Sequence, residues 1–361
     1  MHRATVLRAC TGVATALSLA VVTTACDDSS PKSASSTAPS NVLAGEANPN
    51  APIKKDLTIG FLPKQITNLY FALASEGGEK AVQELGSAFV EEGPDDASDA
   101  TAQASYVKVL RQEGANAIAV SAQSPDALCG ALKDAMGHGV KVVTYDSDTN
   151  PECRNVFVSQ ASAEDLGLTQ VGMIARQIDF EGEIAVLSAA RDATNQNSWI
   201  KYMKETLKED RDYEKVELVE IAYGDDDEKK SLEQTKRLLQ DHPNLKGIIA
   251  PTTVGIKAAA QYLSGSTYKG KVKLTGLGTP NDMREFIKDG TVEEFALWDP
   301  AELGELAAHA AVALASGIIS GKEGQDFDAG DMGLFTLGAD GVVSLGEPTL
   351  FNAKNIDKYD F

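Results

Sequence analysis

Short apolar runs alternate with amphipathic stretches of helical length from residue 57 onward, and this alternation constrains the fold more than any other feature. Expected helices near 70–85, 100–112 and 125–136 separate apolar runs at 57–62, 88–91, 117–120 and 140–144. Short apolar runs that are bounded by turns and joined through helices indicate βαβ units, and such units build a parallel sheet.

The same pattern restarts further along the chain. Apolar runs follow at 184–187, 216–221, 247–250, 272–275 and 295–297, with helices between them and a long helix at 300–316. A chain of 361 residues is too long for one compact core. The sequence therefore predicts the α/β class, with two doubly wound parallel-sheet lobes joined by a hinge.

Each lobe is expected to combine segments that are distant in sequence. The N-terminal lobe should contain residues 57–159 plus a return segment at 299–324, and the C-terminal lobe residues 160–298 plus 325–361. In the tail, apolar runs at 334–337 and 342–345 flank the turn-forming residues 338–341, which predicts a hairpin.

The first 56 residues differ from the rest of the chain. Residues 1–25 combine early arginines, an apolar stretch at 13–22 and small residues, which is typical of an export signal. Cys26 follows directly, as in the lipobox of bacterial lipoproteins, although Thr23 stands where that motif usually has leucine. The alternative is an ordinary secretory signal that contains a cysteine.

Residues 26–56 are rich in Ser, Ala, Pro, Asn and Asp and contain few large apolar side chains, which predicts a flexible linker. We therefore expect an exported protein that a lipid on Cys26 anchors to the outer face of the cell membrane.

Two cysteines remain once Cys10 leaves with the signal and Cys26 carries the lipid. In an oxidising compartment Cys129 and Cys153 are expected to form a disulfide, and the alternative is a pair of free buried thiols. The bond would close a loop of about 25 residues, which contributes roughly 3 kcal/mol in the chain-entropy model.

Charge and motifs exclude several classes of function. A formal net charge of −20 makes nucleic acid and anionic lipid poor partners. The segment 265–272 resembles a phosphate-binding loop but ends in Val272 where Ser or Thr would hold magnesium. The acidic run 225–227 is explained by capping of the helix that follows it. The histidines have no paired spacing, so we expect no metal, no cofactor and no enzyme.

Open parallel sheets bind ligands outside the carboxyl ends of their strands. Asp146 directly follows an apolar run, and its carboxylate can accept two hydroxyl hydrogen bonds; its alternatives are a helix cap or a partner for Arg154. Aromatic rings pack on the apolar faces of sugars, so Trp298 is either a ligand contact or core. Of Tyr70 and Phe71, at least one should be structural.

Four segments carry a resemblance to a known family. They are residues 59–71, 121–129, 145–154 and 355–361. In them the chain resembles the type I periplasmic sugar-binding proteins, the ribose-binding-like receptors of ABC importers. It is most similar to two sister branches, the rhamnose-binding receptors and the autoinducer-2 receptors.

A few positions divide the two branches. Autoinducer-2 receptors have a lysine, an aspartate, an Asp-Gln pair and a Pro-x-Ala, where this chain has Lys64, Asp146, Asn195-Gln196 and Pro251-Thr252-Thr253. Asn195 and Thr253 depart from that pattern, which counts against autoinducer-2. The segments 193–199 and 251–255 are more similar to the rhamnose branch. The second-lobe aspartate of pentose receptors aligns with Gly278, which disfavours a ribose-like pose.

The resemblance implies a monomeric, lipid-anchored solute-binding protein that delivers a sugar, rhamnose first, to an ABC permease. The implied binding residues are Lys64, Asn68, Phe71, Asp146, Asn195, Gln196, Pro251, Thr253 and Trp298. Three alternatives stay open: an autoinducer-2 receptor, a sensor that presents its closed form to a chemoreceptor, and a secreted glycoside hydrolase. The hydrolase would use Asp146 and Asp148, whose carboxylates would need a separation of about 5–9.5 Å.

Overall fold

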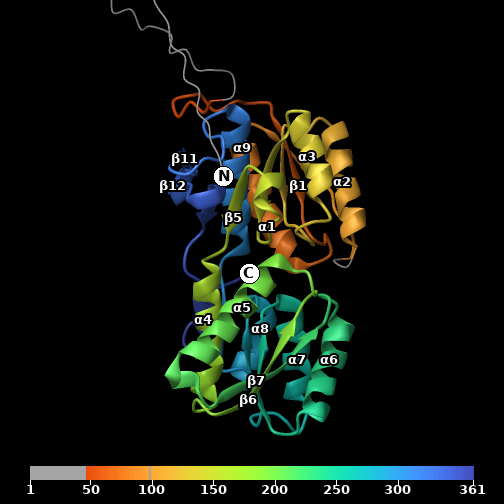
Figure 1. Cartoon of the computed structure of the whole chain (residues 1–361), viewed down its shortest axis with the longest axis vertical. Coiled ribbons are helices and arrows are strands. Elements are labelled where there is room, and N and C mark those ends of the chain that lie inside the picture. The colour runs from red at the N-terminus through yellow and green to blue at the C-terminus, as the bar shows by residue number, and fades with distance from the viewer. Residues whose placement is uncertain (1–45, 97–98) are drawn as a thin grey trace, which may run out of the picture. The chain divides into compact units, whose positions relative to one another are not determined.

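Two parallel sheets, each covered by helices on both faces, carry most of the secondary structure in the computed structural model (Figure 1). It describes residues 46–96 and 99–361. The expected export signal, Cys26 and the linker up to residue 45 lie outside the described residues. Among the residues described, no helix has the length and apolar character needed to cross a membrane.

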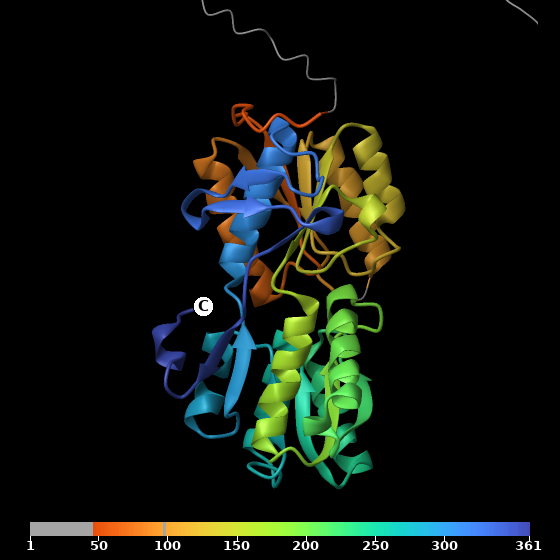
Figure 2. The ribbon, with the colours of Figure 1, turned by 60° about the vertical axis from the view of Figure 1, so that its left-hand side comes forward.

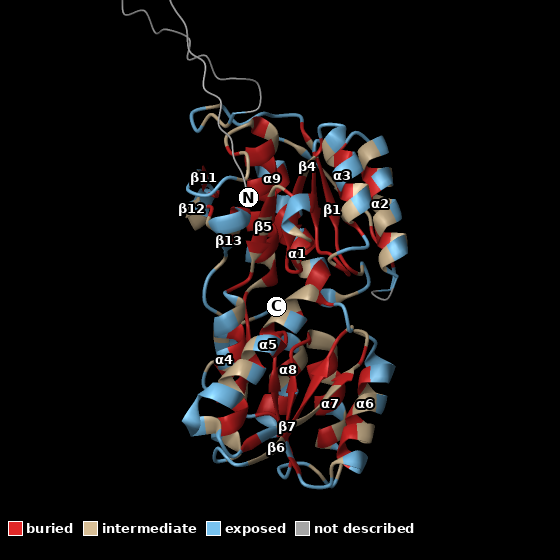
Figure 3. Cartoon of the chain, in the orientation of Figure 1, coloured by how far each residue is buried: buried red, intermediate tan, exposed pale blue. Residues whose placement is uncertain are grey.

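The first sheet has the strand order β13-β5-β4-β3-β1-β2, and every pair in it is parallel. Its strands are β1 (Thr58–Leu62), β2 (Ala88–Glu91), β3 (Ala117–Val120), β4 (Lys141–Tyr145), β5 (Val156–Ser159) and β13 (Val342–Ser344). Helices α1 (Leu69–Glu84) and α9 (Pro300–Ser316) pack together on one face, and α2 (Ala100–Gln112) and α3 (Cys129–Gly137) pack together on the other. All four residues of β3 are buried, as expected for a central strand covered on both faces. Its neighbours β1 and β4 are likewise mostly buried (Figure 3).

The second sheet has the order β7-β6-β8-β9 and is also parallel. Its strands are β6 (Gly182–Ser188), β7 (Val216–Tyr223), β8 (Leu245–Ala250) and β9 (Lys273–Gly276). β10 (Glu294–Leu297) joins β9 through a bridge between Leu277 and Ala296 and pairs antiparallel with β14 (Thr349–Asn352). Its helices are α4 (Ala163–Gln177), α5 (Thr194–Glu209), α6 (Glu228–Asp241), α7 (Thr253–Ser264) and α8 (Pro280–Lys288). The predicted fold class, with two doubly wound lobes, is confirmed.

Within residues 46–96 and 99–361, the chain passes between the two sheets three times: from β5 to α4, from β10 to α9, and from β13 to β14 (Figure 2). The third passage runs beside the first. Leu345 donates its backbone N–H to the carbonyl of Ser159 at 2.8 Å, and Gly346 donates to Gln160 at 3.2 Å. Neighbouring backbone segments of this kind form the natural hinge between two lobes.

The predicted hairpin in the tail is wrong. β12 (Leu334–Thr336) pairs antiparallel with the preceding β11 (Asp326–Asp328), while β13 leaves that pair and lies parallel to β5. The free edge of β5 offers unpaired backbone groups, and Val343 becomes buried when β13 covers them. Part of the tail expected in the second lobe therefore belongs to the first sheet, and β14 is its strand in the second.

Helices α1 and α9 pack unusually closely because a glycine of each faces the backbone of the other. A Cβ atom at Gly77 would overlap the carbonyl oxygen of Ala301, and one at Gly304 would overlap that of Ala74. Both helices begin at capping residues: Asn68 accepts from the N–H of Tyr70 at 3.0 Å, and Asp299 accepts from that of Ala301 at 2.8 Å. This contact fixes the two helix N-termini relative to each other.

Cys129 and Cys153 form the predicted disulfide in the structure, with their Cα atoms 5.2 Å apart. The bond links the first residue of α3 to the short 3₁₀ helix η1 (Pro151–Cys153). It therefore closes the loop that leaves β4 through Asp146.

Candidate functional site

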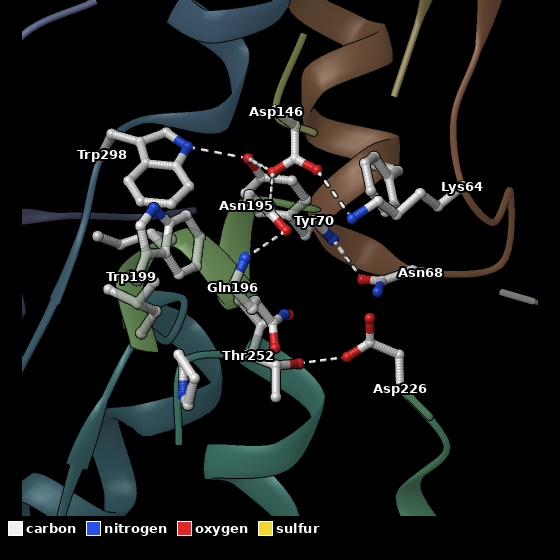
Figure 4. A pocket seen from close by; sticks show the side chains of 15 residues that line it. Lys64, Asn68, Tyr70, Asp146, Asn195, Gln196, Trp199, Asp226, Thr252 and Trp298 are labelled. Carbon is white, nitrogen blue, oxygen red and sulfur yellow. Dashed lines mark hydrogen bonds and ion pairs between the residues drawn. The ribbon is translucent and has the colours of Figure 1, made fainter. Parts of the chain in front are cut away.

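One pocket collects all nine residues that the sequence predicts for the site (Figure 4). It lies at the carboxyl ends of the strands, where the residues that follow β1, β4, β8 and β10 meet. The predicted residues that line it are Lys64, Asn68, Phe71, Asp146, Asn195, Gln196, Pro251, Thr253 and Trp298. Six further residues line it: Tyr70, Trp199, Asp226, Thr252, Leu277 and Leu297.

Asp146 is the centre of the polar network, with 4% of its surface exposed. Its Oδ1 accepts hydrogen bonds from the Tyr70 hydroxyl at 3.1 Å and from Gln160 Nε2 at 2.9 Å. Its Oδ2 accepts from Ser121 at 2.7 Å and lies 3.6 Å from the Lys64 ammonium. Such donors offset the cost of burying the carboxylate and hold it in one orientation in the pocket.

The backbone of Asp146 has a φ of +60°, in the left-handed region that aspartate tolerates better than most residues. Thr144 donates its hydroxyl to Asp148 in the same turn, and Arg154 binds Asp148 through Nε and Nη2, each at 2.8 Å. The alternative in which Asp146 pairs with Arg154 is therefore wrong: Asp148 takes the arginine. Asp146 is left facing the pocket.

Four aromatic rings form a continuous cluster beside this network. Trp298 Nε1 donates to the Tyr70 hydroxyl at 2.9 Å, and the ring centroids of these two residues are 6.1 Å apart, edge to face. Trp199 lies 6.2 Å from Trp298, and Phe71 lies 5.1 Å from Tyr70. Burial, and then the charge of Asp146, raise the pKa of the Tyr70 phenol well above its usual value, so this hydroxyl stays a hydrogen-bond donor.

Asn195 and Gln196 bring the second lobe to the same point from the first turn of α5. Asn195 Nδ2 donates to Asp146 Oδ1 at 3.4 Å, so a side chain of one lobe reaches the central carboxylate of the other. Gln196 Oε1 accepts from the Ser188 hydroxyl and from the N–H of Ala189, both at 2.7 Å. Its carbonyl is thus held by the end of β6, and its amide nitrogen remains for the pocket.

The pocket has two chemically different sides. In Figure 4 the indoles of Trp199 and Trp298 lie on one side, and Lys64, Asn68 and Asp226 lie on the other. The apolar side accepts a hydrocarbon face, and the polar side offers an ammonium, amides and carboxylates that bind hydroxyl groups. Such a pocket fits a small molecule with several hydroxyls and one apolar face.

The sequence missed Trp199 and Asp226. Trp199 lies three residues after Gln196 on α5, and this spacing puts both side chains on the same helix face, a signal that identifies it. Asp226 belongs to an acidic run that the sequence analysis explained by helix capping. That explanation is correct for Asp227, which accepts from the N–H of Lys230 at 2.7 Å at the start of α6.

Within the described residues, the three side chains grouped closely enough to bind a metal ion are Cys129, Glu152 and Cys153. The two sulfurs of this group are bonded to each other, so it offers no thiolate ligand.

Comparison with known proteins identifies relatives over most of the chain. Residues 59–319 match the family model described as "Periplasmic binding protein domain". The crystal structure of a sugar ABC transporter from Actinomyces odontolyticus is 48% identical, with a TM-score of 0.69, and the match covers 84% of this chain and 98% of that one.

Two further solved structures are informative about ligands. An ABC transporter solute-binding protein from Clostridium phytofermentans with bound L-rhamnose is 38% identical, with a TM-score of 0.81 and coverage of 84% of this chain and 98% of that one. LsrB from Clostridium saccharobutylicum in complex with AI-2 is 27% identical, with a TM-score of 0.79 and coverage of 84% and 100%.

Proposed function

Because this chain belongs to the periplasmic binding protein family, as a sugar-binding solute-binding protein of ABC transporters, we propose that its ligand is a deoxyhexose, with L-rhamnose as the leading candidate. The protein captures the sugar outside the cytoplasm as a monomer and delivers it to a membrane permease. The two lobes close over the ligand through the three chain passages between the sheets.

The observation that carries this proposal is the division of the pocket into an aromatic side and a hydroxyl-binding side. Trp298 and Trp199 form a wide apolar surface opposite Lys64 and Asn68. A deoxyhexose matches it, since its methyl group and adjacent C–H face pack on the indoles while its ring hydroxyls face the polar groups. A pentose has no methyl group and would leave part of the aromatic side uncovered.

The polar side favours an uncharged ligand. Lys64 and Asp146 lie 3.6 Å apart and balance each other's charge. Hydroxyl groups are suited to such a pair, because a hydroxyl donates to a carboxylate and accepts from an ammonium at once. Pentose receptors place an aspartate where this chain has Gly278, and the relative at 38% identity contains L-rhamnose, which further supports a deoxyhexose.

Autoinducer-2 is the second candidate, because Lys64, Asp146, Gln196 and Pro251 all line the pocket and match the residues of its receptors. Two positions count against it: Asn195 replaces an aspartate, and Thr253 replaces an alanine. A glycoside hydrolase is disfavoured, since the expected carboxylate pair is divided: Asp146 faces the pocket, and Asp148 is bound by Arg154.

We also propose that a lipid on Cys26 anchors the protein to the outer face of the membrane, which keeps the receptor near its permease. The apolar stretch at 13–22 and the small residues before Cys26 support this. Membrane fractionation of wild-type protein and Cys26→Ala tests it: wild type should sediment with membranes, and the variant should be released. Equal release of both proteins contradicts the anchor and leaves the receptor function untouched.

Calorimetry of the purified protein with L-rhamnose, autoinducer-2 and D-ribose tests the ligand. We expect saturable binding of L-rhamnose, weaker binding of the other two, and no turnover of nitrophenyl glycosides. Binding of autoinducer-2 without binding of L-rhamnose would replace the leading candidate with the second.

A further inference from the structure

Asp226 lines the pocket, although the sequence pattern assigns its acidic run to helix capping and the proposed function gives it no role. It follows β7 in the second lobe, two residues before α6 begins. In Figure 4 its carboxylate faces the side chain of Asn68, which comes from the first lobe. Asp226 also borders the neighbouring hollow lined by Gln65 and Thr67, so it stands at the mouth of the site on its polar side.

The structural roles of the acidic run belong to its other two members. Asp227 caps α6 through the N–H of Lys230, and Asp225 lies 3.3 Å from the Lys230 ammonium. Asp226 instead accepts a hydrogen bond from the Thr252 hydroxyl, and Thr252 itself lines the pocket. The carboxylate is thus oriented by a neighbouring pocket residue.

The electrostatic setting of Asp226 is that of the pocket. Burial raises the pKa of its carboxyl, the hydrogen bond from Thr252 and the charge of Lys64 act in the opposite direction, and the charges of Asp146 and Asp225 raise it. The charge of Asp226 is therefore influenced by Lys64 and Asp146, the two charged residues that the first lobe contributes to the pocket. Because its pKa is raised, the ionised carboxylate lowers the stability of the ligand-free protein. Residues that bind ligands often destabilise a protein in this way.

We propose that Asp226 is a ligand-binding and specificity-determining residue of the second lobe. Its carboxylate accepts hydroxyl hydrogen bonds from the sugar on the side away from the indoles, while Asp146 accepts from the first lobe. Two carboxylates in one pocket also reject sugars that carry a carboxylate or a phosphate, since a third negative charge would have no partner there. This inference rests on the proposed function, in which the ligand is a neutral sugar with several hydroxyls.

The test compares Asp226→Asn with Asp227→Ala. Asparagine retains an oxygen for Thr252 and tolerates the φ of +50° at this position, so the variant should fold. We expect Asp226→Asn to weaken L-rhamnose binding by about 10- to 100-fold, since it removes a charged acceptor. Its unfolding temperature without ligand should equal or exceed that of wild type.

Asp227→Ala should behave in the opposite way. It removes the helix cap, so the unfolding temperature should fall while the affinity for L-rhamnose stays within about twofold. L-rhamnose 1-phosphate, which keeps the sugar ring and adds negative charge, should not bind wild type and should bind Asp226→Asn with measurable affinity.

Affinity within about twofold of wild type for Asp226→Asn overturns the inference, and so does a loss of stability like that of Asp227→Ala. If wild type binds autoinducer-2 but not L-rhamnose, L-rhamnose is excluded as the ligand. The ratio of autoinducer-2 affinities of wild type and Asp226→Asn then decides the role of Asp226. A wild-type protein that binds neither molecule overturns both proposals.

Discussion

Asn195 of the second lobe donates its side-chain amide to Asp146 of the first, with 3.4 Å between Nδ2 and Oδ1. The contact joins the two halves of the site at their central carboxylate. It also gives a physical reason why asparagine suits this position: an aspartate would place a second negative charge beside Asp146 and could not donate.

We expect Asn195→Asp to shift the ligand preference from L-rhamnose toward autoinducer-2. The variant restores the Asp-Gln pair of autoinducer-2 receptors and sets two carboxylates against each other, so L-rhamnose affinity should fall by about tenfold or more. Autoinducer-2 affinity should rise, most of all when Thr253→Ala is added. Calorimetry with both ligands measures the exchange, and Asn197→Asp, on an exposed position of the same helix, is the matched control. Parallel losses for both ligands would contradict this role of Asn195.

Breaking the buried ion pair between Asp148 and Arg154 should reduce the stability of the protein more than its affinity for the ligand. The side chains are only 14% and 2% exposed, and Arg154 also donates to the backbone carbonyl of Asp340, next to β13. Asp148→Asn leaves the guanidinium without its charged partner, so we expect a loss of about 3–5 kcal/mol in the free energy of unfolding. Urea denaturation measures it.

The matched control for this pair is Lys133→Gln, which breaks the exposed ion pair with Glu152 and should cost at most about 1 kcal/mol. A similar small effect for Asp148→Asn would mean that the pair does not support the Asp146 loop.

The contact between α1 and α9 should tolerate no added methyl group. Gly304→Ala forces a Cβ against the carbonyl of Ala74, so we expect a loss of about 1–3 kcal/mol and weaker ligand binding, because α1 carries Tyr70 and α9 follows Trp298. Gly130→Ala in α3 has open space around its Cβ and should be neutral or slightly stabilising. Thermal unfolding of both variants decides this, and equal stability would show that the helices can separate without cost.

Asp226 should make the ligand-free protein less stable as the pH rises. Burial raises its folded-state pKa, so between the unfolded value, about 3.9, and that higher value the folded protein holds more protons than the unfolded chain. This group's contribution to the free energy of unfolding therefore falls through that interval. The advantage of Asp226→Asn over wild type should be near zero at about pH 3.5 and largest at neutral pH. Thermal unfolding across this range tests it, and a constant difference would contradict it.

The two parallel sheets, apart from β13, and most of the residues that line the pocket were predictable because parallel strands deliver their carboxyl ends to one edge. Lys64, Asp146 and Trp298 each follow an apolar run closely, and a local pattern suffices to place them. Asp226 was not predictable in this way, since one acidic run contains both a helix cap and a pocket residue. Only the three-dimensional arrangement separates Asp227, which caps α6, from Asp226, which faces Asn68 in the pocket.

The tail shows a different limit. The apolar runs around β12 and β13 have the composition of strands, but composition does not determine which other strand each one pairs with. β12 folds back on β11, and β13 covers the edge of β5, a strand more than 180 residues earlier in the chain. Such distant pairings depend on which edge remains free once the sheet is formed.

The most direct test of the central claim is a fluorescence titration, because both tryptophans of the chain, Trp199 and Trp298, line the pocket. L-rhamnose seated against the indoles should change the intrinsic emission saturably, and Trp298→Phe should remove most of that change and weaken binding. D-ribose should produce a much smaller effect at the same concentration. An emission that does not respond to L-rhamnose, while autoinducer-2 changes it saturably, would contradict the account of this pocket as a deoxyhexose site.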